Sequence, residues 1–166
     1  MKRRCALAVL LMLVVTVVFA APAQKQSAQT QAATGDDFSG MYSFLREGEF
    51  VQFSLEGQGK LSGFVSRFGD LPSDKDAFLD QFFKTGSTDG KKVSFTTESV
   101  HGTWFEFSGT VSRGPGKTPN DEGYYVIEGK LTKHTEDANK KPSAESRQVT
   151  FKSFPQDLQA GPGKRD

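Results

Sequence analysis

The sequence is short of the residues that make disulfides and metal sites. It has one cysteine, Cys5, one tryptophan, Trp104, and two histidines, His101 and His134. A single cysteine cannot close a disulfide within the chain, so stability has to come from a packed core. Neither histidine has a cysteine or a second histidine at metal-ligand spacing. The sequence therefore predicts no metal ligand set and no cofactor.

Long apolar runs are also scarce, and the one that stands out lies near the start. Residues 2–4 are basic, residues 5–19 are uncharged and mostly apolar, and Ala21-Pro22-Ala23 follows. A basic start, a short apolar run and an A-x-A exit are the parts of a secretory signal peptide. A membrane span needs roughly 20 apolar residues, so an uncleaved anchor is the weaker alternative. We expect a signal peptide over 1–23, a secreted or periplasmic protein, and no stable membrane anchor after cleavage.

After this leader, positive and negative charges are nearly balanced. Three of the 21 Lys and Arg residues lie within it, and all 20 Asp and Glu residues lie after it. The remaining chain has a net charge of about −2, which is not the basic footprint of a nucleic-acid-binding protein. Residues 24–36 are rich in Gln, Ala and Thr and predict a flexible linker. Residues 156–166 predict a disordered tail, which leaves 37–155 as one domain.

Within that domain, apolar and polar residues alternate with a period of two. Phe105 and Phe107 alternate with Glu106 and Ser108, and the same pattern recurs in segment after segment. Side chains of a strand point to opposite faces in turn, so each such segment predicts a strand with one buried face. Parallel strands buried on both faces would be apolar throughout. Eight antiparallel strands are expected near 40–46, 49–55, 60–68, 81–86, 92–99, 103–112, 123–133 and 147–154.

Short turns between these segments predict hairpins, and hence an up-and-down meander. Asp89-Gly90 is the clearest turn signal. One helical pattern interrupts the strands: Ser73 can cap a helix, and apolar residues from Phe78 onward recur at helical spacing. The same residues also suit a strand. We expect a short helix over 74–80, between the third and fourth strands.

Glycines inside the strands indicate a curved sheet. Leu61-Ser62-Gly63, Phe107-Ser108-Gly109 and Ile127-Glu128-Gly129 each place a glycine beside an apolar residue of one face. Interior glycines permit the bends that a closing barrel wall needs. With the opening Gly40-Met41-Tyr42, this pattern resembles the calycin barrels, the lipocalins and avidins. The resemblance implies a barrel that can hold a ligand, and it names no ligand. The chain is also similar to small secreted β-proteins of bacteria.

The densest aromatic segment runs from Trp104 to Phe107 and suggests where a ligand would bind. Aromatic bulk on the inner face would fill much of a narrow barrel and leave a shallow apolar pocket at one mouth. We take Trp104, Tyr42, Phe105, Phe107 and Tyr125 as candidate ligand-binding residues. Packing of Trp104 under a loop or a helix is the alternative.

The functional expectation is a non-catalytic binding module for a small apolar or amphipathic ligand. No paired catalytic side chains are evident, and no catalytic residues are predicted. An envelope or secreted protein-interaction or inhibitor module is the alternative, and a pocket hydrolase or isomerase comes after it. The fold alone does not choose among these classes, and the sequence leaves the oligomeric state open.

Overall fold

The structure, a computed structural model, describes residues 37–159 except 76 and 138. The predicted leader, the predicted linker and the last seven residues lie outside the described residues. Eight strands form one sheet: β1 (Gly40–Ser43), β2 (Phe50–Leu55), β3 (Leu61–Phe68), β4 (Phe78–Thr88), β5 (Lys92–Thr97), β6 (Thr103–Arg113), β7 (Tyr125–Glu136) and β8 (Pro142–Lys152). Two 3-10 turns, η1 (Gly57–Gly59) and η2 (Pro72–Asp74), and one helical turn, α1 (Gln156–Gln159), complete the described elements.

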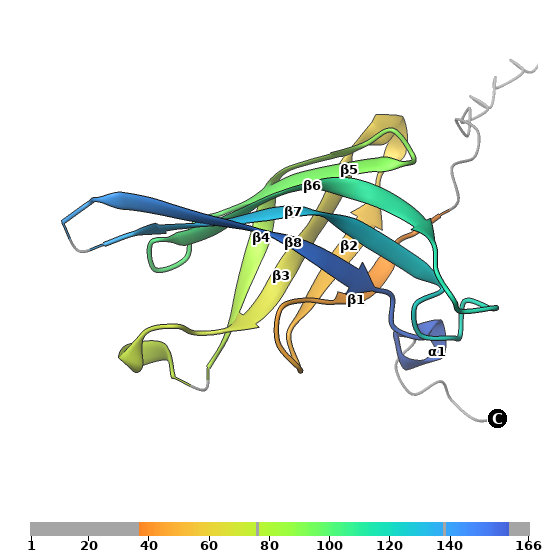
Figure 1. Ribbon diagram of the computed structural model, residues 1–166, viewed down its shortest axis with the longest axis horizontal. Helices are drawn as coiled ribbons and strands as arrows, with labels where there is room; N and C mark the ends of the chain where they lie inside the picture. The colour runs from red at the N-terminus through yellow and green to blue at the C-terminus, as the bar shows by residue number, and fades with distance from the viewer. Residues whose placement is uncertain (1–36, 76, 138, 160–166) are drawn as a thin grey trace, which may run out of the picture. The chain divides into compact units, whose positions relative to one another are not determined.

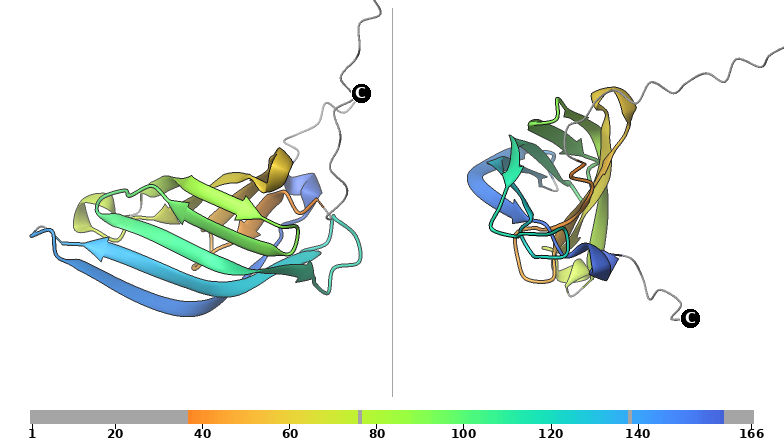
Figure 2. Two further views of the ribbon diagram at one scale, coloured as in Figure 1. Left: turned by 90° about the horizontal axis from the view of Figure 1, so that it is seen from above. Right: turned by 90° about the vertical axis from the view of Figure 1, so that its right-hand side faces the viewer.

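Every strand pairs in antiparallel fashion with the next one along the chain, in the order β1 to β8. Figure 1 shows the sheet strongly curved, and Figure 2 shows it curling around its own concave face. The predicted all-β, up-and-down meander is therefore confirmed. The curling matches the interior glycines: Gly109 of β6 lies opposite Gly129 of β7. Because neither glycine has a side chain, the two backbones and the ring of Phe107 can approach closely.

Alternation along the strands sorts the side chains between the concave and convex faces. In β6, Thr103, Phe105 and Phe107 are buried while Glu106 and Ser108 are exposed. The concave face collects the core, which contains Phe38, Tyr42, Phe44, Val51, Phe53, Leu61, Val65, Val93, Phe95, Phe105, Phe107, Tyr125, Ile127, Leu131 and Phe151. Burial of these side chains, at roughly 1.5–3 kcal/mol each relative to exposure, is the main force that curls the sheet.

The sheet closes only at one end, so the fold is a half-barrel. β1 and β8 meet at a single bridge, between Tyr42 and Ser153. Near it, the amide of Lys152 donates to Ser43 Oγ and the amide of Phe154 donates to the carbonyl of Met41. The other end of β8 continues with β7 as a hairpin that extends away from β1 (Figure 1).

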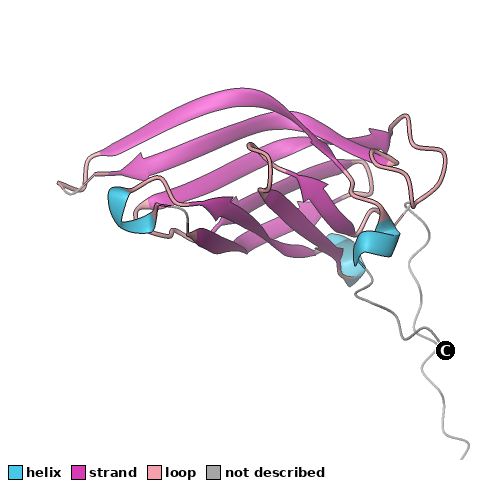
Figure 3. Cartoon of the chain, turned by 90° about the horizontal axis from the view of Figure 1, so that it is seen from below, coloured by secondary structure: helices cyan, strands magenta, loops and turns pink. Residues whose placement is uncertain are grey.

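The segment between β3 and β4 corrects one expectation. A short helix does lie there, but it is the 3-10 turn Pro72–Asp74 rather than a helix over 74–80. Strand β4 already begins at Phe78, which pairs with Phe68. Their rings lie 4.3 Å apart, and a cross-strand aromatic pair of this kind favours a strand over a helix. Figure 3 shows how little helix the described chain contains.

The other boundaries shift by a few residues. The expected strands 123–133 and 147–154 are found at Tyr125–Glu136 and Pro142–Lys152, so this hairpin is longer than the pattern indicated. The Asp-Gly turn before β5 is confirmed: Gly90 has φ 93°, and Asp89 Oδ1 accepts the amides of Lys91 and Lys92. Among the described residues, no helix is long and apolar enough to cross a membrane.

Candidate functional site

Aromatic side chains fill the closed part of the barrel. The rings of Phe53 and Phe95 lie 5.8 Å apart, those of Phe95 and Phe107 5.3 Å, and those of Phe107 and Phe151 5.1 Å. Tyr42 donates its hydroxyl to the carbonyl of Phe38 at 2.6 Å. Burial raises the pKa of the Tyr42 phenol, so the hydroxyl stays protonated. This region is occupied by its own side chains and has little room for a ligand.

The open end holds a cavity of about 330 Å³, which we call the mouth. Its apolar floor is formed by Phe105 of β6, Leu131 of β7 and Leu45 of the β1–β2 turn. Its walls are charged and come from elements distant in sequence: Arg46, Glu49, Arg67, Asp70, Lys133, Glu145 and Arg147. An apolar floor under charged walls is suited to an amphipathic molecule.

Arg67 is the most deeply buried cation in the mouth. It follows Val65 on the inner face of β3, and only 4% of its side chain is exposed. Its guanidinium lies over the ring of Phe105, with 5.6 Å from Cζ to the centroid. Nε donates to Gln81 Oε1 at 2.5 Å, and Nη1 donates to Asp70 Oδ2 at 3.0 Å. Burial lowers the pKa of Arg67, although an arginine stays charged at any physiological pH.

Gln81 anchors this arginine from the neighbouring strand. Its side chain is fully buried, and Nε2 donates to the carbonyls of Thr103 at 2.7 Å and Glu98 at 3.2 Å. With the bond from Arg67, the amide uses both of its donors and its acceptor. A buried polar group with all partners present holds its neighbours in one arrangement. Gln81 thus fixes the position of the Arg67 guanidinium.

Glu49 organises the β1–β2 turn beside the mouth. Its side chain is 2% exposed, and its two oxygens accept three hydrogen bonds and form an ion pair with Arg46. Oε1 accepts hydrogen bonds from Arg46 Nε at 2.8 Å and from the amide of Phe68 at 3.0 Å, and Arg46 Nη2 lies 2.7 Å from it in the ion pair. Oε2 accepts the amide of Arg46 at 3.1 Å. This carboxylate therefore ties the turn to the end of β3.

Asp70 joins the mouth to β7. Lys133 Nζ lies 2.6 Å from Asp70 Oδ2, and Arg46 Nη2 lies 3.8 Å from Oδ1. Partial burial on its own raises the pKa of Asp70. The hydrogen bond and charge of Lys133, with the charges of Arg67 and Arg46, outweigh it and hold that pKa below its usual range. Asp70 is therefore ionised at neutral pH, and its charge is matched by three cations.

Two charges of the mouth stand apart from this network. Glu145 and Arg147 lie on β8, opposite Lys133 and Leu131 of β7, so both face the concave side. Both are exposed, and neither makes an ion pair or side-chain hydrogen bond within the described part of the chain. Over the whole mouth, four cationic side chains face three carboxylates, which leaves an excess of one positive charge.

Comparisons with known proteins identify the fold only. No protein-family model matches the chain, and no curated protein matches it in sequence. Among solved structures, the rhizavidin–biotin complex aligns with a TM-score of 0.52 at 15% identity, covering 70% of this chain and 99% of that one. Rhizavidin alone aligns with a TM-score of 0.52 at 14% identity, covering 70% and 82%. The fold is an avidin-type β-barrel. The expected resemblance to calycin barrels is thereby confirmed.

The five residues selected from the sequence do not gather in one place within this avidin-type fold. Phe105 lies in the floor of the mouth, whereas Tyr42, Phe107 and Tyr125 lie in the filled core. Trp104 lies on the convex face, as alternation with Phe105 requires, and is half-buried. Its ring stacks on His134 of β7, with centroids 4.8 Å apart and planes at 4°. Trp104 is thus separated from the mouth by the sheet.

The charged residues of the mouth were not anticipated, although part of the signal was present. Arg67 continues the inner-face series of Leu61, Gly63 and Val65, so its parity already placed it inside. A charge at an inward position is a marker of a functional site or of a buried network. Glu49 carried the same marker, because it opens the expected strand 49–55 at the parity of the inward residues Val51 and Phe53.

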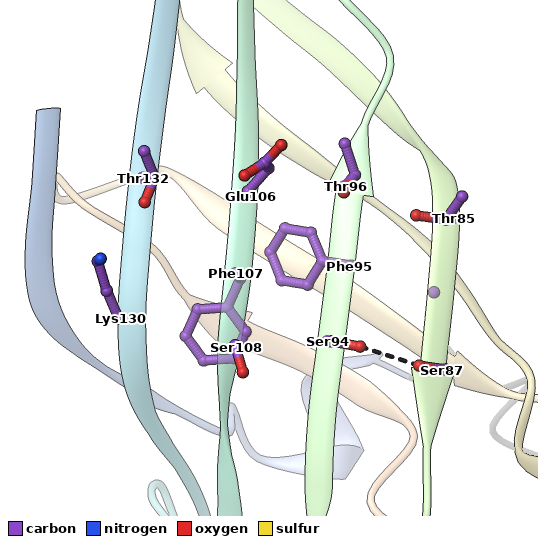
Figure 4. A pocket seen from close by; sticks show the side chains of 11 residues that line it. Thr85, Ser87, Ser94, Phe95, Thr96, Glu106, Phe107, Ser108, Lys130 and Thr132 are labelled. Carbon is purple, nitrogen blue, oxygen red and sulfur yellow. Dashed lines mark hydrogen bonds between the residues drawn. The ribbon is translucent and has the colours of Figure 1, made fainter. Parts of the chain in front are cut away.

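A second depression, of about 340 Å³, lies on the convex face over β4 to β7 (Figure 4). Short hydroxyl side chains line it, among them Ser87 and Ser94, whose oxygens lie 2.9 Å apart. Glu106 and Lys130 flank it, and Phe95 and Phe107 lie beneath. Its polar groups are mostly exposed, so water already satisfies them and a ligand would gain little by replacing it. No group of three or more acidic, histidine or cysteine side chains in the described chain could hold a metal.

Proposed function

We propose that this protein is exported and binds a small amphipathic molecule with an anionic group in the mouth. The observation that carries the proposal is the combination of an apolar floor, Phe105 and Leu131, with Arg67 fixed above it and a net positive wall. Apolar contact with the floor would supply most of the affinity, and the cations would orient the anionic end.

Two further points support this proposal. Among solved neighbours of the same fold, rhizavidin forms a complex with biotin, a small molecule. The core beyond the mouth is filled by aromatic rings, so a ligand would sit at the opening rather than along the barrel axis. Export is supported by the signal-peptide pattern of residues 1–23.

Binding can be tested by calorimetry with matched ligand pairs. A panel of fatty acids, quinones, isoprenoids and biotin is titrated into the mature chain, and decanoate is compared with decanol. We expect an acid to bind more tightly than the alcohol of the same length. Lys133→Gln should weaken the acid roughly tenfold and leave the alcohol unchanged, since a charge-assisted hydrogen bond is worth about 1.5–3 kcal/mol.

Lys130→Gln is the matched control. Lys130 lies on the same strand, three residues earlier, but its side chain points to the convex face. It should not change the affinity for either ligand. Absence of binding by every member of the panel at about 100 μM, which corresponds to roughly 5.5 kcal/mol, would remove the ligand-binding proposal.

A protein-interaction role is the second candidate, and one observation favours it. Phe50, Phe64 and Phe82 form an aromatic row across the convex face of β2 to β4, with centroid distances of 5.7 and 5.6 Å. Phe82 is 61% exposed and Phe78, on the same strand, 50%. Exposed aromatic clusters of this kind mark contact surfaces. Loss of binding to a co-purified partner in Phe82→Ser, but not in Lys133→Gln, would favour this role over the mouth.

A further inference from the structure

The outer edge of β8 is open along most of its length. β7 covers one edge of β8 from Pro142 to Lys152. On the other edge, β1 reaches β8 only at its end, through the bridge to Ser153 and the bond from Lys152 to Ser43. Within the described chain no strand pairs with the outer edge of residues 143–150, and these residues are exposed apart from a half-buried Val149. Such an edge is a template for another strand.

The directions of the backbone groups along this edge follow from the bonds at its end. The amide of Lys152 donates towards β1, whereas the amide of Ser153 donates to the carbonyl of Tyr125 on β7. The β7–β8 register runs from 142 to 152 without a shift, so amides alternate regularly between the two edges. Even-numbered residues, including Ala144, Ser146 and Gln148, therefore present their N–H and C=O groups to the open side.

The side chains on this strand are self-complementary. Glu145 and Arg147 point to the concave face and are the two mouth charges without an ion pair in the described structure. They are two residues apart on one face. When two such strands run antiparallel about a two-fold axis at Ser146, each Glu145 lies directly opposite an Arg147 of the other copy.

We propose that the occupant of this edge is a second copy of the same chain, paired β8 to β8 about Ser146. The register brings Ser146 opposite Ser146 and Ala144 opposite Gln148, and it forms about six backbone hydrogen bonds. Glu145 and Arg147 then fall at the positions between bonded pairs, where opposing side chains are closest. The concave faces of the two sheets become continuous, and the two mouths lie next to each other.

Charge selects this register over its neighbours. Paired residues must lie on the same face of the sheet, so the register can shift only by two residues at a time. Each such shift moves the two-fold axis by one residue. An axis at Glu145 places Glu145 against itself, and an axis at Arg147 places Arg147 against itself. Like charges directly opposite destabilise a strand pair. Only the axis at Ser146 pairs both charges with their opposites in both directions.

The dimer is expected to be weak, because an edge of about seven residues is a small interface. Sedimentation equilibrium of the mature chain, from Gln24 to Asp166, therefore has to extend from about 1 to 300 μM, the range of a micromolar dissociation constant. Arg147→Glu and Glu145→Arg should each weaken self-association roughly tenfold or more, because attraction becomes repulsion at two sites. An equimolar mixture of the two variants should associate, since each supplies the charges that the other lacks.

Three further variants complete the test. Ser146→Pro removes an N–H at the open edge, leaves the β7–β8 ladder intact, and should abolish the dimer. Lys130→Glu changes a charge on the convex face of β7 and should leave self-association unchanged. Phe82→Ser tests whether the aromatic row of the convex face contributes to self-association instead. A wild-type chain that stays monomeric at about 300 μM overturns the proposal. So does a dimer that persists in Arg147→Glu and Ser146→Pro but is lost in Phe82→Ser. None of these readouts depends on a ligand, so the dimer can fail while the proposed function stands.

Discussion

The bond between Gln81 and Arg67 allows a quantitative test of what holds the mouth together. Gln81→Leu replaces a fully buried amide by an apolar side chain of similar size. The change removes the acceptor of Arg67 Nε and the donors to the carbonyls of Thr103 and Glu98. Because Arg67 and Thr103 are themselves buried, water cannot easily replace these partners.

The cost of Gln81→Leu follows from those three lost bonds. An unsatisfied buried partner of a charged group costs about 2 kcal/mol. The buried carbonyl of Thr103 keeps the amide of Val100 as a donor but loses one hydrogen bond, which costs about 1 kcal/mol. The carbonyl of Glu98 is only part-buried and adds about 0.5 kcal/mol. The extra apolar surface of leucine returns about 1 kcal/mol. We expect the free energy of unfolding to fall by about 2–3 kcal/mol.

A double-mutant cycle separates this bond from general disturbance of the core. Arg67→Met keeps an unbranched apolar stem, removes the guanidinium that lies over Phe105, and leaves Gln81 Oε1 without its donor. The double variant removes both partners, and replacing both ends of a buried bond costs less than breaking it from one side. Its destabilisation should fall short of the sum of the single effects by about 1–2 kcal/mol.

Urea unfolding followed by Trp104 emission and far-ultraviolet dichroism gives these free energies, with unchanged m-values as the condition for comparison. Gln148→Leu is the control: it makes the same change at an exposed position of β8 and should shift stability by less than about 0.5 kcal/mol. A loss below about 1 kcal/mol for Gln81→Leu, or strictly additive effects in the cycle, would refute the reasoning.

Three further outcomes are expected. The lowered pKa of Asp70 stabilises the fold above the unfolded pKa of about 3.9, and this stability is lost as the pH falls through the lower folded pKa. Wild type should therefore be more stable than Asp70→Asn at pH 5, and acid unfolding curves should show this difference narrowing towards pH 3. Gly109→Ala should cost about 2 kcal/mol in urea, because its Cβ would lie 2.3 Å from the carbonyl oxygen of Glu128, whereas Gly57→Ala, with nothing within 4 Å, should be neutral. Amino-terminal sequencing of exported protein should begin at Gln24; an intact leader, or a start within 5–19, contradicts that prediction.

The strand pattern was predictable because it depends on local alternation. Phe105 and Phe107 face the core and Glu106 faces solvent, as their spacing required. Local pattern could not place Phe78 and Phe82, because their spacing suits a helix as well as a strand. The pairing of Phe78 with Phe68 and of Phe82 with Phe64 decides for the strand, and both contacts are non-local.

The site was less predictable than the fold, because its polar residues are brought together by pairing across the sheet. Arg67 and Gln81 are 14 residues apart, and Asp70 and Lys133 are 63 apart. No local motif links them. The sequence predicted aromatic ligand-binding residues instead, and most of these pack elsewhere. Phe107 and Tyr125 lie in the core, and Trp104 lies on the opposite face of the sheet.

The incomplete closure of the barrel and the charged mouth have one common cause in the sequence. Near the closed end, the inner face of β8 carries Val149 and Phe151, which pack against the core. Towards the hairpin, the same face carries Ser143, Glu145 and Arg147. These side chains have too little apolar surface to draw β8 over the core towards β1, and burying their polar groups unpaired would cost several kcal/mol. The sheet therefore stops curling where the apolar series ends, which leaves an open strand edge and a water-accessible cavity side by side.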